Sequence, residues 1–252
     1  RDVFYALFPP IDVSLSHTEQ AVLLTARSAG VNEIIARLIN AIHESAAPVE
    51  VITEQDTPDS RFVRLSKAQA RRLLLAPGMD TIKGIRDTTI IATMLCTGIR
   101  EEELTRLEVG DEDQRLSEYP ALWVRRGKGT KARLIPYGEQ DWARRLIRYW
   151  LDAAGIEHGP IFRAVRKNGN IGEGPLTTRA VQYILKSYPI LIHGTLTNVT
   201  PHDLRRTYAR RQFEAGMDLT AIQQNLGHSS LDTTLRYIGA LDVRMRLGRQ
   251  AY

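Results

Sequence analysis

The segment "TPHDLRRTYARRQFEAG", Thr200 to Gly216, carries one histidine and four arginines in a stretch that is predicted to be helical. These arginines can form a solvated helix face, bind a phosphate or, together with the histidine, act chemically on one. His202 and Arg205 are three positions apart, so a helix places them on the same face. The N-terminus of a helix also offers free N–H groups and partial positive charge to an anion. The rest of the chain has to decide between these interpretations.

The composition is that of an ordinary globular protein. The chain has 252 residues, of which 43% are hydrophobic and 25% are charged. No apolar run approaches the ~18 residues of a membrane span, and the first residues do not resemble a signal peptide. Cys96 is the single cysteine, so neither an internal disulfide nor a cysteine-based zinc site is expected. These features are typical of a reducing, intracellular setting.

Charge is divided unevenly along the sequence. Residues 1–60 contain three arginines and nine acidic residues, a net charge of −6, and the remainder has a net charge of +11. A basic body favours a polyanionic partner, with nucleic acid as the first candidate. Solubility alone is the competing explanation for the charge.

Apolar periodicity predicts a mainly α fold with a small antiparallel β-sheet (α+β). Residues 1–60 are predicted to be a short acidic helical segment that ends in a linker, and residues 61–252 a second unit. In that unit, Ser66 and Gln69 form a capping-box pattern, and Gly98 ends a buried apolar helix. Two apolar runs around the turn "GKGT" predict a hairpin over residues 121–137. Further helices are expected over residues 139–154, 177–188, 201–215, 219–226 and 231–246.

Three other segments hold residues that are suited to phosphate chemistry. In "CTGIREEEL", Arg100 follows a glycine that ends a helix, so a rigid turn presents it; a salt bridge to one of the next three acids is the alternative. In "RRGKGTKARLIP", Lys128 lies at the tip of a basic hairpin, which suits a DNA-backbone contact or a reach into a groove. In "NLGHSSLDTTLRYIG", His228 follows a glycine at a helix end, and Tyr237 lies nine residues later.

The residue types match the needs of phosphodiester cleavage. Arginine is the best hydrogen-bond donor to a phosphate, because its planar guanidinium fits the phosphate oxygens and stays charged. Histidine and lysine exchange protons near neutral pH. A tyrosine hydroxyl is a weak nucleophile until nearby cations favour the phenolate. For Tyr237 the competing interpretation is an aromatic residue of the core.

Taken in this order, these motifs resemble those of the tyrosine recombinase (phage integrase) family. The residues that carry the resemblance are Arg100 in "TGIREEEL", Lys128 in "GKGTKARLIP", the "HDLRRTYA" run, and "LGHSSLDTTLRYIG" with Tyr237. The resemblance covers roughly residues 61–240. It implies a tyrosine-recombinase catalytic domain fold, preceded here by the short helical N-terminal segment. It also implies a site-specific DNA recombinase that acts through a 3′-phosphotyrosyl intermediate, in integration, excision or resolution.

The resemblance further implies a role for each matching residue. Tyr237 attacks the scissile phosphate and releases a 5′-hydroxyl, and a 5′-hydroxyl of a partner strand then attacks the ester. Arg100 and Arg205 are implied to contact the non-bridging oxygens, and His228 to donate a hydrogen bond to the phosphate. Lys128 is the implied general acid, and His202 accepts the proton of the tyrosine. Lys131 is the second choice for the general acid, because hairpin register is not determined by the sequence. The ester conserves the bond energy, so no metal, nucleotide or other cofactor is expected.

The implied partner is double-stranded DNA, in the cytoplasm or nucleoid of a prokaryotic cell. The protein is expected to bind it as a homo-oligomer, with four protomers in the synapse. No association with a membrane is expected. Basic residues expected on the DNA backbone are Arg125, Arg126, Lys131, Arg133, Arg206 and Arg210. For Arg206, Arg210 and Arg211, pairing with acidic residues is the alternative. Relatives usually carry a basic core-binding domain, whereas residues 1–60 are short and acidic. They are either a truncated core-binding domain or serve another purpose. Residues after Tyr237 are expected to form a helix that packs on a neighbouring protomer or contacts DNA.

Three other functions compete with the recombinase. A type IB-like topoisomerase shares the chemistry but relaxes a single duplex, and the spacing in "LGHSS…Y" favours the recombinase. A catalytically inactive relative would only bind DNA, although every expected position is filled. A helix-turn-helix regulator built on "DLTAIQQNLGHSSLDTTLRY" leaves Arg100 and Lys128 without a role. The target DNA sequence and the direction of recombination cannot be read from the chain.

Overall fold

The computed structural model describes residues 63–125, 132–138 and 141–238. Predictions made for residues 1–60, for the hairpin tip with Lys128, and for the tail after Ile238 lie outside these ranges. The division of the chain at residue 60 therefore stays a prediction.

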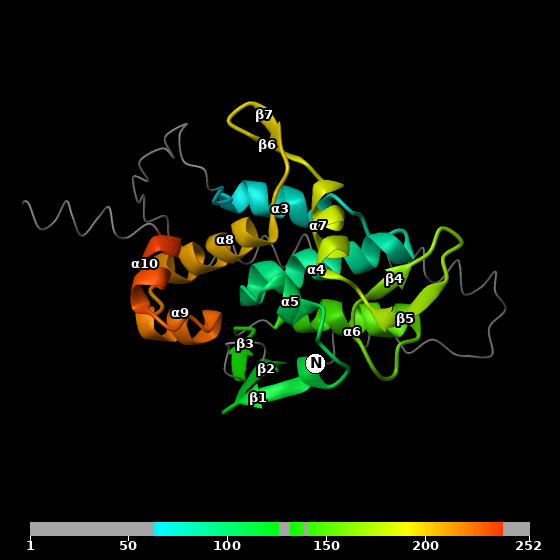
Figure 1. Cartoon of the computed structure of the whole chain (residues 1–252), viewed down its shortest axis with the longest axis horizontal. Helices are drawn as coiled ribbons and strands as arrows, with labels where there is room; N and C mark the ends of the chain where they lie inside the picture. Colours follow the sequence, from blue (N-terminus) through cyan, green and yellow to red (C-terminus); the bar gives the residue numbers. More distant parts are fainter. Residues whose placement is uncertain (1–62, 126–131, 139–140, 239–252) are drawn as a thin grey trace, which may run out of the picture.

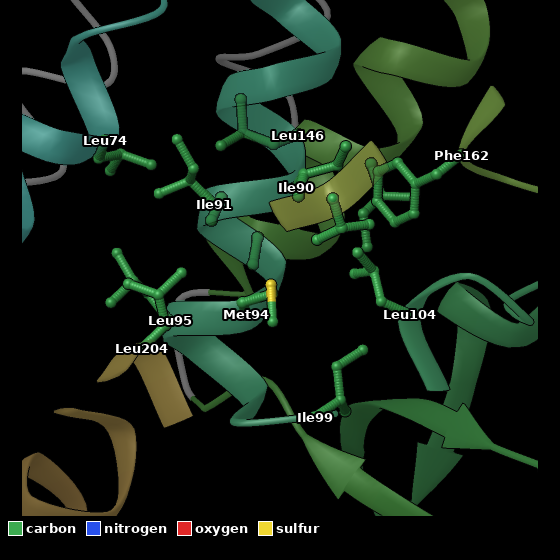
Figure 2. Packing of buried hydrophobic residues seen from close by; sticks show 14 of the residues in the cluster. Leu74, Ile90, Ile91, Met94, Leu95, Ile99, Leu104, Leu146, Phe162 and Leu204 are labelled. Carbon is green, nitrogen blue, oxygen red and sulfur yellow. The ribbon is translucent and has the colours of Figure 1, made fainter. Parts of the chain in front are cut away.

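A buried helix, α4 (Ile82–Thr97), forms the centre of the fold (Figure 1). The side chain of Thr81 caps its start, and Gly98 ends it in a left-handed conformation, as predicted. Helices α3 (Lys67–Leu75) and α6 (Trp142–Ala154) pack against it. Figure 2 shows the resulting core, in which Ile90, Ile91, Met94 and Leu95 of α4 lie among Leu74, Leu146, Phe162 and Leu204.

Capping residues set the ends of the other helices in this core. The predicted capping box of α3 is confirmed, with Ser66 and Gln69 each bonding the backbone of the other. Helix α6 ends at Gly155 in a left-handed conformation, also as expected. Thr177 caps α7 (Thr178–Lys186) by accepting from a backbone N–H of its first turn.

An antiparallel sheet lies beside this core. β1 (Gln114–Leu116), β2 (Tyr119–Val124) and β3 (Arg133–Pro136) follow one another in the sheet, and Val124 pairs with Arg133 at its end. The predicted hairpin over residues 121–137 is confirmed. β1 was not predicted, because all three of its residues are exposed and show no apolar alternation. The pairing places Arg133 at the start of β3, directly after the hairpin tip.

Two further hairpins were not predicted. β4 (Arg163–Val165) pairs with β5 (Ile171–Pro175), and β6 (Ile190–Ile192) pairs with β7 (Thr195–Thr197). Figure 1 shows the first at the end of the molecule opposite α10 and the second projecting beyond α3. Three of these strands have only three residues, and β5 contains two glycines and a proline, so they carry no clear apolar alternation. The expectation of a single sheet was therefore too simple.

The last three described helices gather at one end of the molecule (Figure 1). They are α8 (Pro201–Glu214), α9 (Leu219–Leu226) and α10 (Leu231–Ile238), and β3 contacts α9. A second, smaller core lies between them, made of Tyr208, Ala209, Ile222, Leu226, Leu235 and Ile238. This core holds α10 against α8, so it brings the two ends of the "HDLRR…Y" pattern together.

The predicted class, mainly α with small antiparallel sheets, is confirmed by this architecture. None of the described helices is both long enough and apolar enough to cross a bilayer.

Candidate active site

The turn between α4 and α5 (Glu101–Leu104) presents Arg100. Gly98 has a φ of +62°, and a Cβ at this position would overlap the ring of Tyr208. Only glycine therefore lets α8 pack against the turn. The side chain of Arg100 is 32% exposed and donates from Nη1 to Glu103 at 3.2 Å. The salt bridge considered from the sequence is thus present, and Nη2 of the same arginine donates to the carbonyl of Gly227 at 3.3 Å.

The N-terminus of α8 is capped by Thr200. Thr200 and Asp203 form a capping box in which each side chain accepts from the backbone N–H of the other. His202 is left exposed in the first turn. Arg205 lies one turn further on and is 2% exposed. The arginine is therefore not part of a solvated helix face.

Arg205 ties the ends of two helices together. Its Nη1 donates to the carbonyl of Gly98 and its Nη2 to the carbonyl of Leu226, both at 2.5 Å. Burial first, and the charge of Arg100 second, lower its pKa to about 10, so it stays protonated at neutral pH. A cation this buried has little surface open to an anion that approaches from solvent.

His228 is held as a neutral imidazole at the end of α9. Its Nδ1 lies 3.0 Å from the hydroxyl of Thr234. Burial first, and then the positive charges of nearby arginines, lower its pKa to about 3. When Thr234 donates to Nδ1, the ring proton lies on Nε2, which can donate to an anion.

Tyr237 projects from α10 into the same cluster. Its hydroxyl lies 3.3 Å from Nδ1 of His202. Its ring meets the ring of His228 edge-on, with centroids 4.9 Å apart. The guanidinium groups of Arg205 and Arg206 lie 5.9 Å and 5.3 Å from its centroid. A tyrosine hydroxyl, two imidazoles and two guanidinium groups therefore lie close together in a single chain.

Two arginines hold the C-terminal end of α10. Arg210 donates to the carbonyl of Ile238 at 2.8 Å, and Arg64 donates to the carbonyl of Tyr237 at 3.4 Å. Both carbonyls belong to the last turn of the described helix, where intrahelical partners are lacking. These bonds fix the backbone that carries the tyrosine.

The structure brings together five of the six residues predicted to act in the chemistry: Arg100, His202, Arg205, His228 and Tyr237. The sixth, Lys128, lies outside the described residues. Within the described ranges, no three His, Cys, Asp or Glu side chains are grouped so that they could hold a metal ion.

The chain matches a known protein family. The sequence model of the phage integrase family matches residues 63–243, which is most of the chain. The chain belongs to the phage integrase family. All the residues of the cluster lie within the matched range.

Similar phage integrase family proteins include bacterial tyrosine recombinases. Tyrosine recombinase XerC of Staphylococcus haemolyticus is 36% identical over 169 residues, which are 66% of this chain and 53% of the relative. Tyrosine recombinase XerD of Xanthomonas axonopodis pv. citri is 32% identical over 194 residues, 75% of this chain and 62% of the relative. The chain thus spans between half and two thirds of these relatives.

Solved structures share the phage integrase fold. XerA recombinase matches with a TM-score of 0.55 at 24% identity, over 100% of this chain and 83% of that one. The XerH site-specific recombinase bound to a palindromic difH substrate matches with a TM-score of 0.58 at 19% identity, over 94% and 72%. A lambda integrase dimer bound to a COC′ core site matches with a TM-score of 0.53 at 18% identity, over 94% and 68%. At these identities the matches establish the fold alone.

The residues predicted to contact the DNA backbone have partners within this phage integrase domain. Arg126 and Lys131 lie outside the described residues. Each of the other four lies within 4 Å of an acidic side chain, in the pairs Arg125 with Asp111, Arg133 with Glu103, Arg206 with Asp203 and Arg210 with Glu214. Arg133 is only 10% exposed, so it reaches a DNA backbone only by leaving its partners. Pairing with acids was the alternative considered for Arg206 and Arg210, whereas the burial of Arg133 was not foreseen from the sequence.

Sequence reasoning named Glu103 only as one of three possible salt-bridge partners of Arg100, and the short helix places it three positions after Arg100. Two other residues that support the cluster were missed. Thr234 and Arg64 carry no such signal. Arg64 is 173 positions from the tyrosine whose carbonyl it contacts, and only the folded chain brings them together.

Proposed function

We propose that this chain contains the catalytic domain of a site-specific DNA recombinase that cleaves and rejoins strands through a 3′-phosphotyrosyl intermediate. The observation that carries the proposal is the position of Tyr237. Its hydroxyl lies 3.3 Å from His202, in a cluster that also holds Arg100, Arg205 and His228. If Tyr237 were only an aromatic residue of the core, these polar and charged neighbours would not be expected.

In the cleavage step, the oxygen of Tyr237 attacks the phosphorus of the scissile phosphodiester. The phenolic proton passes to His202, and the bond between phosphorus and the 5′-oxygen breaks. Lys128, assigned from the sequence, gives a proton to the leaving 5′-oxygen. The products are a 3′-phosphotyrosyl ester and a free 5′-hydroxyl.

The charges of the site suit the negative charge that develops on the phosphate. Three arginines and the carboxylate of Glu103 together have a net charge of +2 and are largely buried. The arginines are Arg100, Arg133 and Arg205. Arg100 is exposed enough to meet a phosphate first, whereas Arg205 is almost fully buried. Fixed donors in a water-poor site contribute most where charge appears only in the transition state.

Rejoining is the reverse reaction with a different strand. The 5′-hydroxyl of a partner strand attacks the phosphotyrosyl ester, His202 returns the proton to Tyr237, and Lys128 accepts the proton of the incoming hydroxyl. Exchange between two duplexes requires four such sites, so the working assembly is a tetramer on double-stranded DNA. The similar recombinases are bacterial, and we place the reaction on DNA in the cytoplasm.

Covalent trapping tests the proposal. The chain and its Tyr237→Phe variant are incubated with nicked duplexes drawn from the DNA that flanks the gene. The nick lets the short strand with the 5′-hydroxyl diffuse away, so the ester accumulates. A denaturation-resistant protein–DNA band in the wild type alone is expected. A band of equal strength in both proteins, or none on any duplex, contradicts the proposal, and strand transfer between two duplexes separates a recombinase from a topoisomerase.

A further inference from the structure

Arg133, the first residue of β3, forms hydrogen bonds with residues next to the proposed active site. Its Nη1 and Nη2 donate to the two oxygens of Glu103 at 2.8 Å and 2.9 Å. Its Nε donates to the carbonyl of Asn225 at 2.7 Å. All three nitrogens are therefore used within the chain, and the side chain is 10% exposed. A bidentate pair of this kind fixes orientation as well as charge.

Glu103, which Arg133 holds in place, in turn bonds Arg100. One carboxylate oxygen accepts from Nη1 of Arg100 at 3.2 Å, and the other accepts from the backbone N–H of Arg100 at 2.8 Å. Burial alone would raise the pKa of Glu103, but the hydrogen bond and charge of Arg133, followed by those of Arg100, outweigh burial and lower it. Arg133 thus keeps the carboxylate ionised, and the ionised carboxylate holds the exposed arginine of the cluster.

The end of α9 is held from three sides. Three consecutive carbonyl groups each accept from a different arginine, in the pairs Asn225 with Arg133, Leu226 with Arg205 and Gly227 with Arg100. Carbonyls at a helix C-terminus lack intrahelical partners and carry partial negative charge, so cations are favourable there. The next residue is His228. The position of this imidazole therefore depends on the same arginines.

The contact between Arg133 and this turn is close. Gly227 has a φ of +63°, and a Cβ there would lie 3.1 Å from Cζ and Nη1 of Arg133. A larger residue would push the guanidinium away from the turn. Glycine at this position therefore serves the approach of Arg133 as well as the end of the helix.

We infer that Arg133 is a positioning residue, which fixes Arg100 through Glu103 and fixes His228 through the end of α9. The inference rests on the proposed function, because it assigns Arg133 to the support of that same site. It replaces the DNA-backbone contact expected from the sequence. A contact of Arg133 with the DNA backbone would require it to leave Glu103 and the carbonyl of Asn225, to which all three of its side-chain nitrogens donate.

The test compares Arg133→Lys with Arg144→Lys. Lysine keeps the charge but cannot bond both oxygens of Glu103 and the carbonyl of Asn225 at once. Arg144 is the matched control, because it also pairs with carboxylates, those of Asp113 and Asp141, which are not part of the cluster. Three quantities are measured: the cleavage rate at saturating nicked duplex, the Kd for that duplex, and hydrogen exchange in residues 219–230 of the free protein.

For Arg133→Lys, the cleavage rate should fall about 10- to 100-fold, as misplaced groups in a site produce. The Kd should stay within about twofold, because no phosphate contact is lost. Exchange in residues 219–230 should become faster, and Arg144→Lys should match the wild type in all three. A raised Kd with an unchanged rate would overturn the inference in favour of a DNA contact. Wild-type rate and exchange in Arg133→Lys would also overturn it, since charge alone would then suffice.

Glu103→Gln gives a second route to the same answer, should Arg133→Lys fold poorly. We expect a loss of rate in Glu103→Gln, and a loss in the double variant that is smaller than the product of the two single losses, because both changes break the contact between Arg133 and Glu103. Losses that multiply would contradict a shared role. The exchange measurement needs no DNA. If the wild type forms no covalent complex, the proposed function fails, and exchange still decides whether Arg133 holds the end of α9.

Discussion

At the scale of single residues, burial separates the two arginines proposed to bind the phosphate. Arg100 is partly exposed, whereas Arg205 is 2% exposed and bonded to two carbonyl groups. A buried donor contributes little to the first encounter with DNA. It contributes most once charge develops on the phosphate next to it.

Replacing Arg205 should therefore damage cleavage more than binding. Arg205→Lys is expected to lower the single-turnover cleavage rate by about 10²- to 10³-fold, as for loss of one oxyanion donor. DNA affinity, measured by titration, should change only a few-fold, because other phosphate contacts supply it. Thermal unfolding checks that the variant is folded. Equal losses in rate and affinity would contradict the role of Arg205.

His228 should remain neutral far below the ordinary histidine pKa. Its pKa in the folded chain is lowered to about 3, whereas the unfolded chain takes up the proton near 6.5. The unfolded state therefore binds more protons between these values. The contribution of His228 to stability is complete above about pH 6.5 and is lost as pH falls towards 3.

An NMR titration of the imidazole checks this. From pH 8 to pH 5 the ring signals of His228 should not move. In urea unfolding experiments, His228→Asn should also show a weaker fall in stability over this range than the wild type. A titration midpoint near 6.5 would show that the burial and the arginine charges do not act as described.

At the scale of elements, the turn after α4 depends on the absence of a side chain. Gly98 and Gly155 both end helices with a φ of +62°, but only Gly98 has a ring, that of Tyr208, against it. Gly155→Ala should cost about 1–2 kcal/mol for the left-handed conformation alone. Gly98→Ala should cost about 1–3 kcal/mol more for the overlap. Urea unfolding measures both, and equal losses would argue against the close packing of α8.

Helix α10 depends on Arg210 for its position. The arginine bonds the carbonyl of Ile238 and also pairs with Glu214. Arg210→Ala should lower the cleavage rate roughly tenfold, equivalent to the loss of one hydrogen bond to a charged donor. Glu214→Ala removes only the partly exposed ion pair and should stay close to the wild type. If the cleavage rate fell less in Arg210→Ala than in Glu214→Ala, the bond from Arg210 to the carbonyl of Ile238 would not matter for catalysis.

At the scale of the whole molecule, sequence and structure agree where signals are local. Capping residues such as Ser66 and Gly98 correctly marked helix ends, and apolar periodicity predicted the mainly α class. The three-residue strands such as β4 and β6 were missed, because so short a segment shows no period. The contacts of Arg133 and Arg64 also escaped, because their partners are distant in the sequence. Motif order identified which residues meet, but not which of them are buried.

The central claim is that Tyr237 is the nucleophile, and the most direct measurement identifies the residue that carries the DNA. Covalent complexes trapped on nicked duplexes are digested with protease and nuclease, and the linked peptide is sequenced by mass spectrometry. We predict that the nucleotide is joined through its 3′-phosphate to Tyr237, and that the strand released from the duplex ends in a 5′-hydroxyl. A nucleotide on any other residue, or a 5′-phosphate on the released strand, would contradict the claim.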